Sequence, residues 1–397
     1  MPVLLMLSRP ILAIVLLSTP LASGGEAGDY AAVSLGADSS GGLSSGGASP
    51  VSALSTFNIV IQPGSSLAGN SEAMAAFQRA ANSWAAYISD PITVVIDADV
   101  RSFGTGQENV IGGTSSYLLV GGYSGLRDAM VADAAGDGND SIVAALPTMS
   151  YNLNVQSMSG VNFSGNVLLT KANAKALGFS SSMLDGIVGT TTDAVIDFNS
   201  DFAFDYNRAD GIAAGTIDFE SVALHEIGHA LGFISQTDLA DQVAGFNGGI
   251  PYLTTSEGNV PLTQLDLTTL DLFRLAAGSQ HGTASEFADA VRELTPGGEA
   301  VFFDGDHEYD LSTGVAWGDG RQASHWKDDG LTGERIGAMD PTIGYQQAWG
   351  LSEPDLRALD LIGYDIASLA GVPEPAAGIL MGVAGCLMWR RRRAASE

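Results

Sequence analysis

His225-Glu226-Ile227-Gly228-His229-Ala230-Leu231-Gly232, an H-E-x-x-H-x-x-G motif, is the most informative segment of this 397-residue chain. On an α-helix, residues four apart share a face, so His225 and His229 can present ring nitrogens to one metal ion. Glu226 is rotated onto an adjacent face and can reach a water molecule on that metal. Zinc lowers the pKa of such a water toward about 7, and Glu226 can take its proton as the water attacks a polarised carbonyl. The pattern is typical of zinc hydrolases.

The residues around this motif predict a helix. Asp218 has a side chain suited to an N-cap, and Gly232 can adopt the left-handed conformation that ends a helix. The residues between them that supply an apolar face are Phe219, Val222, Ala223, Ile227, Ala230 and Leu231. We therefore expect one amphipathic helix that carries the whole motif.

A catalytic zinc site needs a third protein ligand and keeps a fourth position for water. In the compact motif of metzincin peptidases that ligand is a His three residues after the glycine, but Ser235 stands there in this chain. The candidates that remain are His325, Asp238, His281 and His307. The surroundings of His281 and His307 are typical of solvated loops.

The order of further motifs resembles the leishmanolysin family of metzincin peptidases. In that family the helix ends in H-E-x-x-H-x-x-G-F, and the third His, followed by Trp, comes after a long insertion and shortly before a turn that contains Met. This chain has Gly232-Phe233, then His325-Trp326, then Met339 within Gly337-Ala338-Met339-Asp340-Pro341, in the same order. The resemblance covers about residues 216 to 345.

This resemblance implies a role for each matched residue. By it, His225, His229 and His325 are the zinc ligands, Glu226 is the general base, and Met339 lies in the turn beneath the metal. The leishmanolysin family is also disulfide-rich and is kept latent by a prosegment cysteine. Here Cys386 is the only cysteine, so neither an internal disulfide nor this form of latency is available.

The resemblance and the pattern of elements predict an α+β fold, a metzincin-like peptidase domain over residues 53–366. We expect two lobes, 53–232 and 233–366, the first with a twisted sheet and packed helices and the second rich in loops. A strand over 57–61, a helix over 72–88 and a strand over 92–96 would open the first lobe.

Three further elements are expected around the site. The strand 192–198 could form the edge of the cleft and pair with an extended peptide. The apolar residues of 263–277 predict a buried helix. Ser352, Pro354 and Asp355 predict the start of a C-terminal helix that closes the domain near Tyr364.

The two ends of the chain predict export. Residues 1–25 read as a secretory signal peptide, and 26–52 as a flexible leader rich in Gly and Ser. In 367–397, Pro373-Glu374-Pro375 precedes an apolar run and the cluster Arg390-Arg391-Arg392-Arg393. This order resembles the PEP-CTERM sorting tail of Gram-negative bacteria, which implies processing by an exosortase-type enzyme. A generic C-terminal membrane anchor is the alternative. Either way, the membrane contact would be confined to the tail, and the protein would reach the cell surface, matrix or medium.

The composition limits the partners. A formal net charge of −28 argues against nucleic acid and anionic lipid, since such a surface repels phosphates. It suits Ca²⁺, for which the acidic turns 137–140, 197–201 and 304–306 are candidates. An EF-hand is excluded because Phe202 and Arg208 occupy the positions of its glycine and its bidentate glutamate.

Together these features predict an exported zinc endopeptidase that acts on protein or peptide substrates. Two alternatives stay open. One is a non-catalytic surface or matrix protein that binds metal on the same scaffold. The other is a zinc hydrolase for a non-peptide amide or ester, which would need a closed pocket in place of an open cleft.

Overall fold

A computed structural model describes residues 4–5, 57–136, 140–243, 252–255 and 258–367. The expected leader and the expected sorting tail from residue 368 onward lie outside this part of the chain. So does the expected signal peptide, except for β1 (Leu4–Leu5), which pairs with β18 (Thr342–Ile343). No helix in the described residues is long and apolar enough to span a bilayer.

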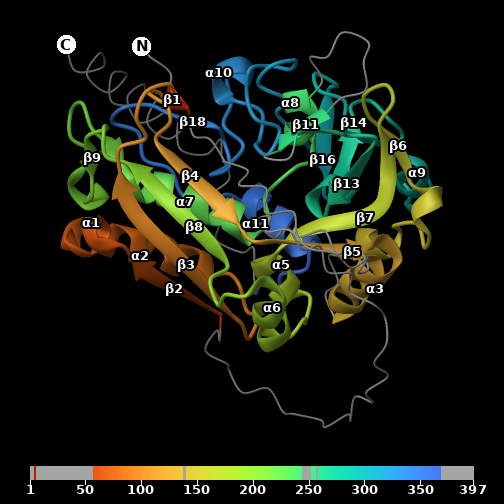
Figure 1. Ribbon diagram of the computed structural model, residues 1–397, viewed down its shortest axis with the longest axis horizontal. Coiled ribbons are helices and arrows are strands. Elements are labelled where there is room, and N and C mark those ends of the chain that lie inside the picture. The colour runs from red at the N-terminus through yellow and green to blue at the C-terminus, as the bar shows by residue number, and fades with distance from the viewer. Residues whose placement is uncertain (1–3, 6–56, 137–139, 244–251, 256–257, 368–397) are drawn as a thin grey trace, which may run out of the picture.

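A four-stranded sheet supports the motif helix. Its strands, in spatial order, are β2 (Asn58–Pro63), β3 (Thr93–Arg101), β8 (Ala194–Asn199) and β4 (Gly112–Ser116). The first three are parallel, and β4 runs antiparallel to β8 (Figure 1). The α+β fold class and the strands expected over 57–61 and 92–96 are confirmed. The expectation that 192–198 forms the cleft edge is wrong, because β4 pairs with the outer side of β8 and is itself the edge.

Helices α2 (Ser71–Ala85) and α7 (Phe219–Leu231) pack together and against this sheet. Phe198 of β8 contacts both, with ring centroids 5.3 Å from Phe77 and 4.3 Å from Phe219. Buried Trp84 donates from its indole nitrogen to the carbonyl of Leu224, at 3.0 Å. The helix expected over 72–88 is thus confirmed, and its apolar residues fix the position of α7.

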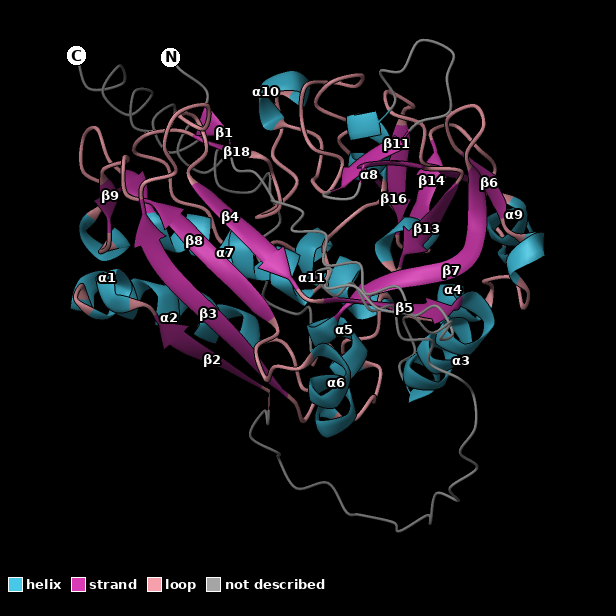
Figure 2. Ribbon diagram, viewed as in Figure 1, coloured by secondary structure: helices cyan, strands magenta, loops and turns pink. Residues whose placement is uncertain are grey.

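Two further sheets lie on the other side of the molecule (Figure 2). One has the order β17 (Glu308–Asp310), β16 (Ala300–Phe303), β14 (Arg274–Ala276), β15 (Val291–Glu293) and β6 (Asn154–Gln156). The other has the order β13 (Gln264–Thr268), β7 (Asn162–Thr170) and β5 (Leu118–Gly122). Both combine strands from before and after residue 232.

The segment 263–277 is not the expected helix. It forms β13, the 3₁₀ turn Leu270–Phe273 and β14. The carboxylate of Asp271 accepts from the backbone N–H of Thr268 and of Gln236, both at 2.9 Å, which stabilises a tight turn. A short apolar run has the same composition in a buried strand as in a buried helix, and here the partners β7 and β16 decide in favour of strands.

The C-terminal helix α11 (Glu353–Leu361) is confirmed together with its cap. Ser352 and Asp355 form a reciprocal capping box, with Pro354 in the first turn.

The remaining helices and strands of the fold are α1 (Ser65–Ala68), α3 (Tyr123–Asp133), α4 (Ser141–Ala144), α5 (Lys171–Ala176), α6 (Ser181–Val188), β9 (Phe204–Asp205), β10 (Ile217–Asp218), α8 (Thr237–Val243), β11 (Tyr252–Thr255), β12 (Gly258–Pro261), α9 (Ala284–Asp289) and α10 (Asp329–Thr332).

Candidate metal centre

Helix α7 begins and ends where its sequence predicts. The side chain of Asp218 accepts from the N–H of Ser221 at 2.9 Å, which satisfies one of the free donors of the first turn. Gly232 follows the last turn with a φ of +130°, a conformation that side chains disfavour. Every residue of the helix is buried, so the whole H-E-x-x-H motif lies inside the protein.

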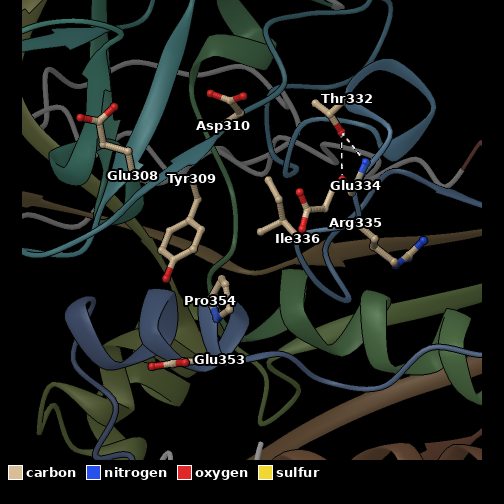
Figure 3. A pocket seen from close by; sticks show the side chains of 9 residues that line it. All are labelled: Glu308, Tyr309, Asp310, Thr332, Glu334, Arg335, Ile336, Glu353 and Pro354. Carbon is tan, nitrogen blue, oxygen red and sulfur yellow. Dashed lines mark hydrogen bonds between the residues drawn. The ribbon is translucent and has the colours of Figure 1, made fainter. Parts of the chain in front are cut away.

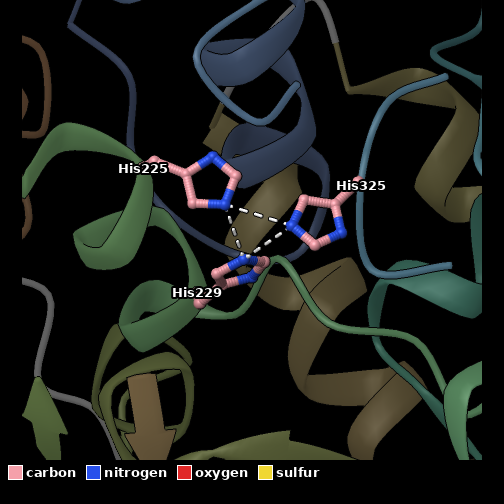
Figure 4. A group of neighbouring side chains, drawn as sticks. All are labelled: His225, His229 and His325. Atoms are coloured by element: carbon pink, nitrogen blue, oxygen red, sulfur yellow. Dashed lines mark hydrogen bonds between the residues drawn. The ribbon is translucent and has the colours of Figure 1, made fainter. Parts of the chain in front are cut away.

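Three histidines converge on one point. The Nε2 atom of His225 lies 3.1 Å from that of His229 and 3.1 Å from that of His325, and the last two are 3.2 Å apart (Figure 4). Together they form a buried cluster able to hold a metal ion. These separations would allow all three nitrogens to lie at the usual zinc–nitrogen distance of about 2.0–2.1 Å from one ion.

The other ring nitrogens fix the tautomers. Nδ1 of His225 lies 2.8 Å from the carbonyl of Ala338, Nδ1 of His229 2.7 Å from that of Phe233, and Nδ1 of His325 3.0 Å from that of Gln322. A carbonyl only accepts, so each Nδ1 carries the proton and each neutral ring keeps a lone pair on Nε2. Three lone pairs that face one another without a shared proton repel, and a bound cation removes that repulsion.

Burial also favours the neutral rings that a metal requires. It lowers the pKa of His229 to about 4, and it lowers the pKa of His225 and of His325 well below the usual range. Around neutral pH the three rings are therefore unprotonated on Nε2, the state in which imidazole binds a metal.

Glu226 lies beside this cluster and is fully buried. Its Oε2 accepts a hydrogen bond from the hydroxyl of Thr114 at 2.7 Å, and its buried Oε1 has no hydrogen-bond partner. Burial raises the pKa of Glu226 to about 8, and the bond from Thr114 acts in the opposite direction. A nearby divalent cation would lower this pKa further. The donor set and the free oxygen fit a metal ion with a carboxylate at its side.

The turn 337–341, which contains Met339 and is called the Met-turn below, lies against the motif helix α7. A Cβ at Gly228 would be 2.3 Å from Sδ of Met339, so the two segments can approach only because residue 228 is glycine. The carboxylate of Asp355, from α11, accepts from the N–H of Ala338 at 2.7 Å and from the indole N–H of Trp326 at 2.8 Å. Asp355 thereby holds together the turn that orients His225 and the residue that follows His325.

The alternative third ligands lie elsewhere. Asp238 accepts from the N–H of Ala323 at 2.5 Å and from both the N–H and the hydroxyl of Ser324, so it braces the loop before His325. His281 pairs with Glu308 at 2.9 Å, and the side chain of His307 is 68% exposed beside Asp304. None of the three belongs to the histidine cluster.

In the acidic turns that were expected to bind calcium, carboxylates interact with other groups of the protein. Asp197 pairs with Arg101 at 2.6 Å, Asp140 pairs with Arg357, and Asp304 accepts from the N–H of His307 at 2.6 Å. Residues 137–139 lie outside the described part of the chain.

A different acidic group was missed in the sequence. Carboxylate oxygens of Asp328, Asp329 and Asp340 lie within 4.8 Å of one another and could hold a second ion. Arg321 pairs with Asp328, and Arg335 lies 3.6 Å from Asp329 and 3.8 Å from Asp340, so two cations already balance part of this charge.

A cavity of about 410 Å³ lies apart from the histidines, between β17, the end of α10 and the start of α11 (Figure 3). Its lining residues are Glu308, Tyr309, Asp310, Thr332, Glu334, Arg335, Ile336, Glu353 and Pro354. The cavity is therefore rich in carboxylates and contains none of the metal-centre side chains.

Thr114 and Asp355 are the contacts of the centre that sequence reasoning did not assign to it. Thr114 lies in Gly112-Gly113-Thr114-Ser115-Ser116, which carries no pattern that points to a site. The sequence predicts Asp355 only as a capping residue.

No protein-family model matches this chain, and no curated protein or solved structure does.

Proposed function

We propose that this protein is an exported zinc-dependent endopeptidase with a leishmanolysin-like split zinc site. The observation that carries the proposal is the convergence of three Nε2 lone pairs, with every Nδ1 proton already donated to a carbonyl, beside a carboxylate with one free oxygen. His225, His229 and His325 would hold the zinc ion.

The chemistry divides between the ion and the chain. A bound zinc ion would polarise the scissile carbonyl and make the attacking water more acidic. Oε1 of Glu226 takes the proton of that water and passes it to the amine nitrogen as the peptide bond breaks, while the carbonyl partners of the Nδ1 atoms keep the rings oriented. General-base assistance of this kind contributes about 100-fold to 10,000-fold in rate.

The edge strand β4 supports a peptide as the substrate. One side of β4 pairs with β8, and no strand of the described residues pairs with the other side. We propose that an extended peptide adds to this free side, next to Glu226, by backbone hydrogen bonds.

A second candidate is a metal-binding protein without turnover. The complete burial of Glu226 and of the three rings favours it, since a substrate must reach the centre. The test measures bound zinc together with casein cleavage, with and without a chelator. Zinc-dependent cleavage supports the peptidase, whereas stoichiometric zinc without cleavage of casein or gelatin supports the second candidate.

Export and sorting form a separate part of the proposal. We propose that the signal peptide is removed and that an exosortase-type enzyme processes the tail. Intact-mass analysis of protein from the native cell surface or medium should find neither residues 1–24 nor the cluster Arg390–Arg393. If Trp389 is still joined to Arg390, a simple membrane anchor replaces the sorting tail.

A further inference from the structure

Strand β4 meets the side chain of Glu226 at two of its residues. Thr114 is 3% exposed, and its hydroxyl oxygen lies 2.7 Å from Oε2 of Glu226 and 2.8 Å from the backbone carbonyl oxygen of the same residue. The strand therefore contacts both the carboxylate and the backbone of one residue of α7. No other side-chain hydrogen bond to the Glu226 carboxylate occurs in the described structure.

Gly112 faces the same side chain from two positions earlier on the strand, where alternation places residues on one face. A Cβ at Gly112 would lie 2.7 Å from Oε1 of Glu226 and 3.0 Å from Cγ1 of Val222. Contacts under 3.0 Å are sterically forbidden for a Cβ, so any other residue would displace the carboxylate or the strand. Glycine here leaves room for Oε1.

Glu226 is therefore held at one oxygen and given space at the other. Oε1 is buried and has no hydrogen-bond partner, which costs free energy unless another group meets it when the site is in use. The water molecule whose proton Glu226 would take is such a group. The arrangement keeps that oxygen free because the other one is already bound by Thr114.

We propose that Thr114 is a positioning residue for Glu226, and that Gly112 reserves the space in which Oε1 receives the proton. The inference rests on the proposed peptidase function. The side chain of Thr114 does not touch the substrate in this scheme. It restricts the rotation of the carboxylate and so sets the direction in which Oε1 points.

The expected magnitude follows from the role. The loss of Thr114 cannot cost more than the loss of the general base itself, about 100-fold to 10,000-fold. A misplacement of about 1 Å costs about 100-fold. We therefore expect Thr114→Val to lower kcat by about 10-fold to 100-fold with little change in KM, because the shape of the side chain is kept and only the hydroxyl is lost.

The activity experiment compares Thr114→Val with Thr114→Ser, which keeps the hydroxyl, and with Thr216→Val, which removes a hydroxyl that donates to the carbonyl of Ala213 in the loop before β10. Each zinc-loaded protein is assayed on a quenched peptide after its zinc content is measured. Thr114→Ser should recover kcat to within about 3-fold of the parent, and Thr216→Val should equal the parent. Full zinc content with parental kcat in Thr114→Val would overturn the inference. If Thr114→Val does not fold, Thr114→Ala takes its place in the same comparison.

Gly112→Ala tests the space beside Oε1. It should bind zinc like the parent and lose at least about 10-fold in kcat, since the added methyl group displaces the carboxylate. Parental kcat in this variant would remove Gly112 from the inference.

A measurement on the metal-free protein is independent of activity. Thr114→Val is made in the parent and in Glu226→Ala, and the thermal midpoints are compared as a double-mutant cycle. The drop caused by Thr114→Val should be about twice as large when Glu226 is present, because only then is a buried carboxylate left without its donor. Equal drops would show that the two side chains are not coupled and would overturn the inference. If coupling is found but the parent cleaves no peptide, the proposed function fails and the contact stands.

Discussion

Gly228 and Gly186 are both glycines inside helices, yet they should respond to alanine in opposite ways. In an exposed helix interior, alanine is more favourable than glycine by about 1 kcal/mol. Apart from its chain neighbours and the backbone of its own helix, Gly186 in α6 has no atom within 4 Å of the position of a Cβ, so Gly186→Ala should raise the free energy of unfolding by about 0.5–1 kcal/mol. At Gly228 a Cβ would lie 2.3 Å from Sδ of Met339 and 3.4 Å from Cζ2 of Trp84.

Gly228→Ala gains the same helix propensity but overpacks the core. Met339 and Trp84 are both fully buried, so neither can move into solvent, and overpacking costs about 1–3 kcal/mol. The net result should be a loss of up to about 2 kcal/mol, in place of the gain expected at Gly186. Because the Met-turn that is pushed away also carries the Ala338 carbonyl, which orients His225, zinc affinity should fall by about 10-fold to 100-fold.

The assay is urea unfolding of the metal-free proteins, followed by zinc titration against a competing chelator. Gly186→Ala is the matched control for propensity. In a Met339→Ala background the cost of Gly228→Ala should largely disappear, since the clashing sulfur is gone. Stabilisation by Gly228→Ala equal to that at Gly186 would refute the reasoning, because it would mean that the Met-turn is not packed against the motif helix.

Three other predictions concern single groups. Glu226→Gln should keep zinc but lose about 100-fold to 10,000-fold in peptide cleavage, as measured by zinc content and kcat; cleavage at the parental rate would exclude Glu226 as the base. His325→Ala should lose zinc during dialysis against a weak chelator, whereas His281→Ala and His307→Ala should retain it; retention by a folded His325→Ala protein would remove that ligand. Asp90 is 2% exposed, and burial raises its pKa to about 7, whereas an unfolded carboxyl titrates at about 3.9. The folded state thus binds more protons than the unfolded state between about pH 4 and 7. As the pH rises through this range, Asp90 lowers the free energy of unfolding by up to about 4 kcal/mol, and above about pH 7 this loss stays constant. Asp90→Asn should remove this decline in urea midpoints recorded from pH 4 to 8, and an unchanged slope would show that Asp90 is not its source.

Local signals in the sequence were sufficient for the helices around the site. The capping residues Asp218 and Gly232 predict the two ends of α7, and Ser352 predicts the start of α11. These predictions succeed because a helix cap depends on residues only a few positions away. The segment 263–277 could not be assigned in the same way. Its apolar residues are buried by strands far away in the chain, and that pairing leaves no mark on its own spacing.

The residues of the site also fall into those that local sequence signals predict and those that they do not. His225, Glu226 and His229 follow from helical periodicity alone. His325 could be singled out only by resemblance, since nothing in a separation of 96 residues shows that two rings will meet at 3.2 Å. Thr114 had no signal at all, because a Gly-Gly-Thr-Ser-Ser strand looks like a loop until it pairs with β8.

The bonds of Asp355 determine how much of the chain the candidate metal centre needs. A growing chain already contains the three histidines and Glu226 once residue 325 has been made, but the carboxylate that bonds the N–H groups of Ala338 and Met339 and the indole of Trp326 comes later, in the last helix of the domain. A domain generally folds as one unit. Partial chains that contain all three histidines therefore still lack the carboxylate that joins the turn behind His225 to the residue after His325.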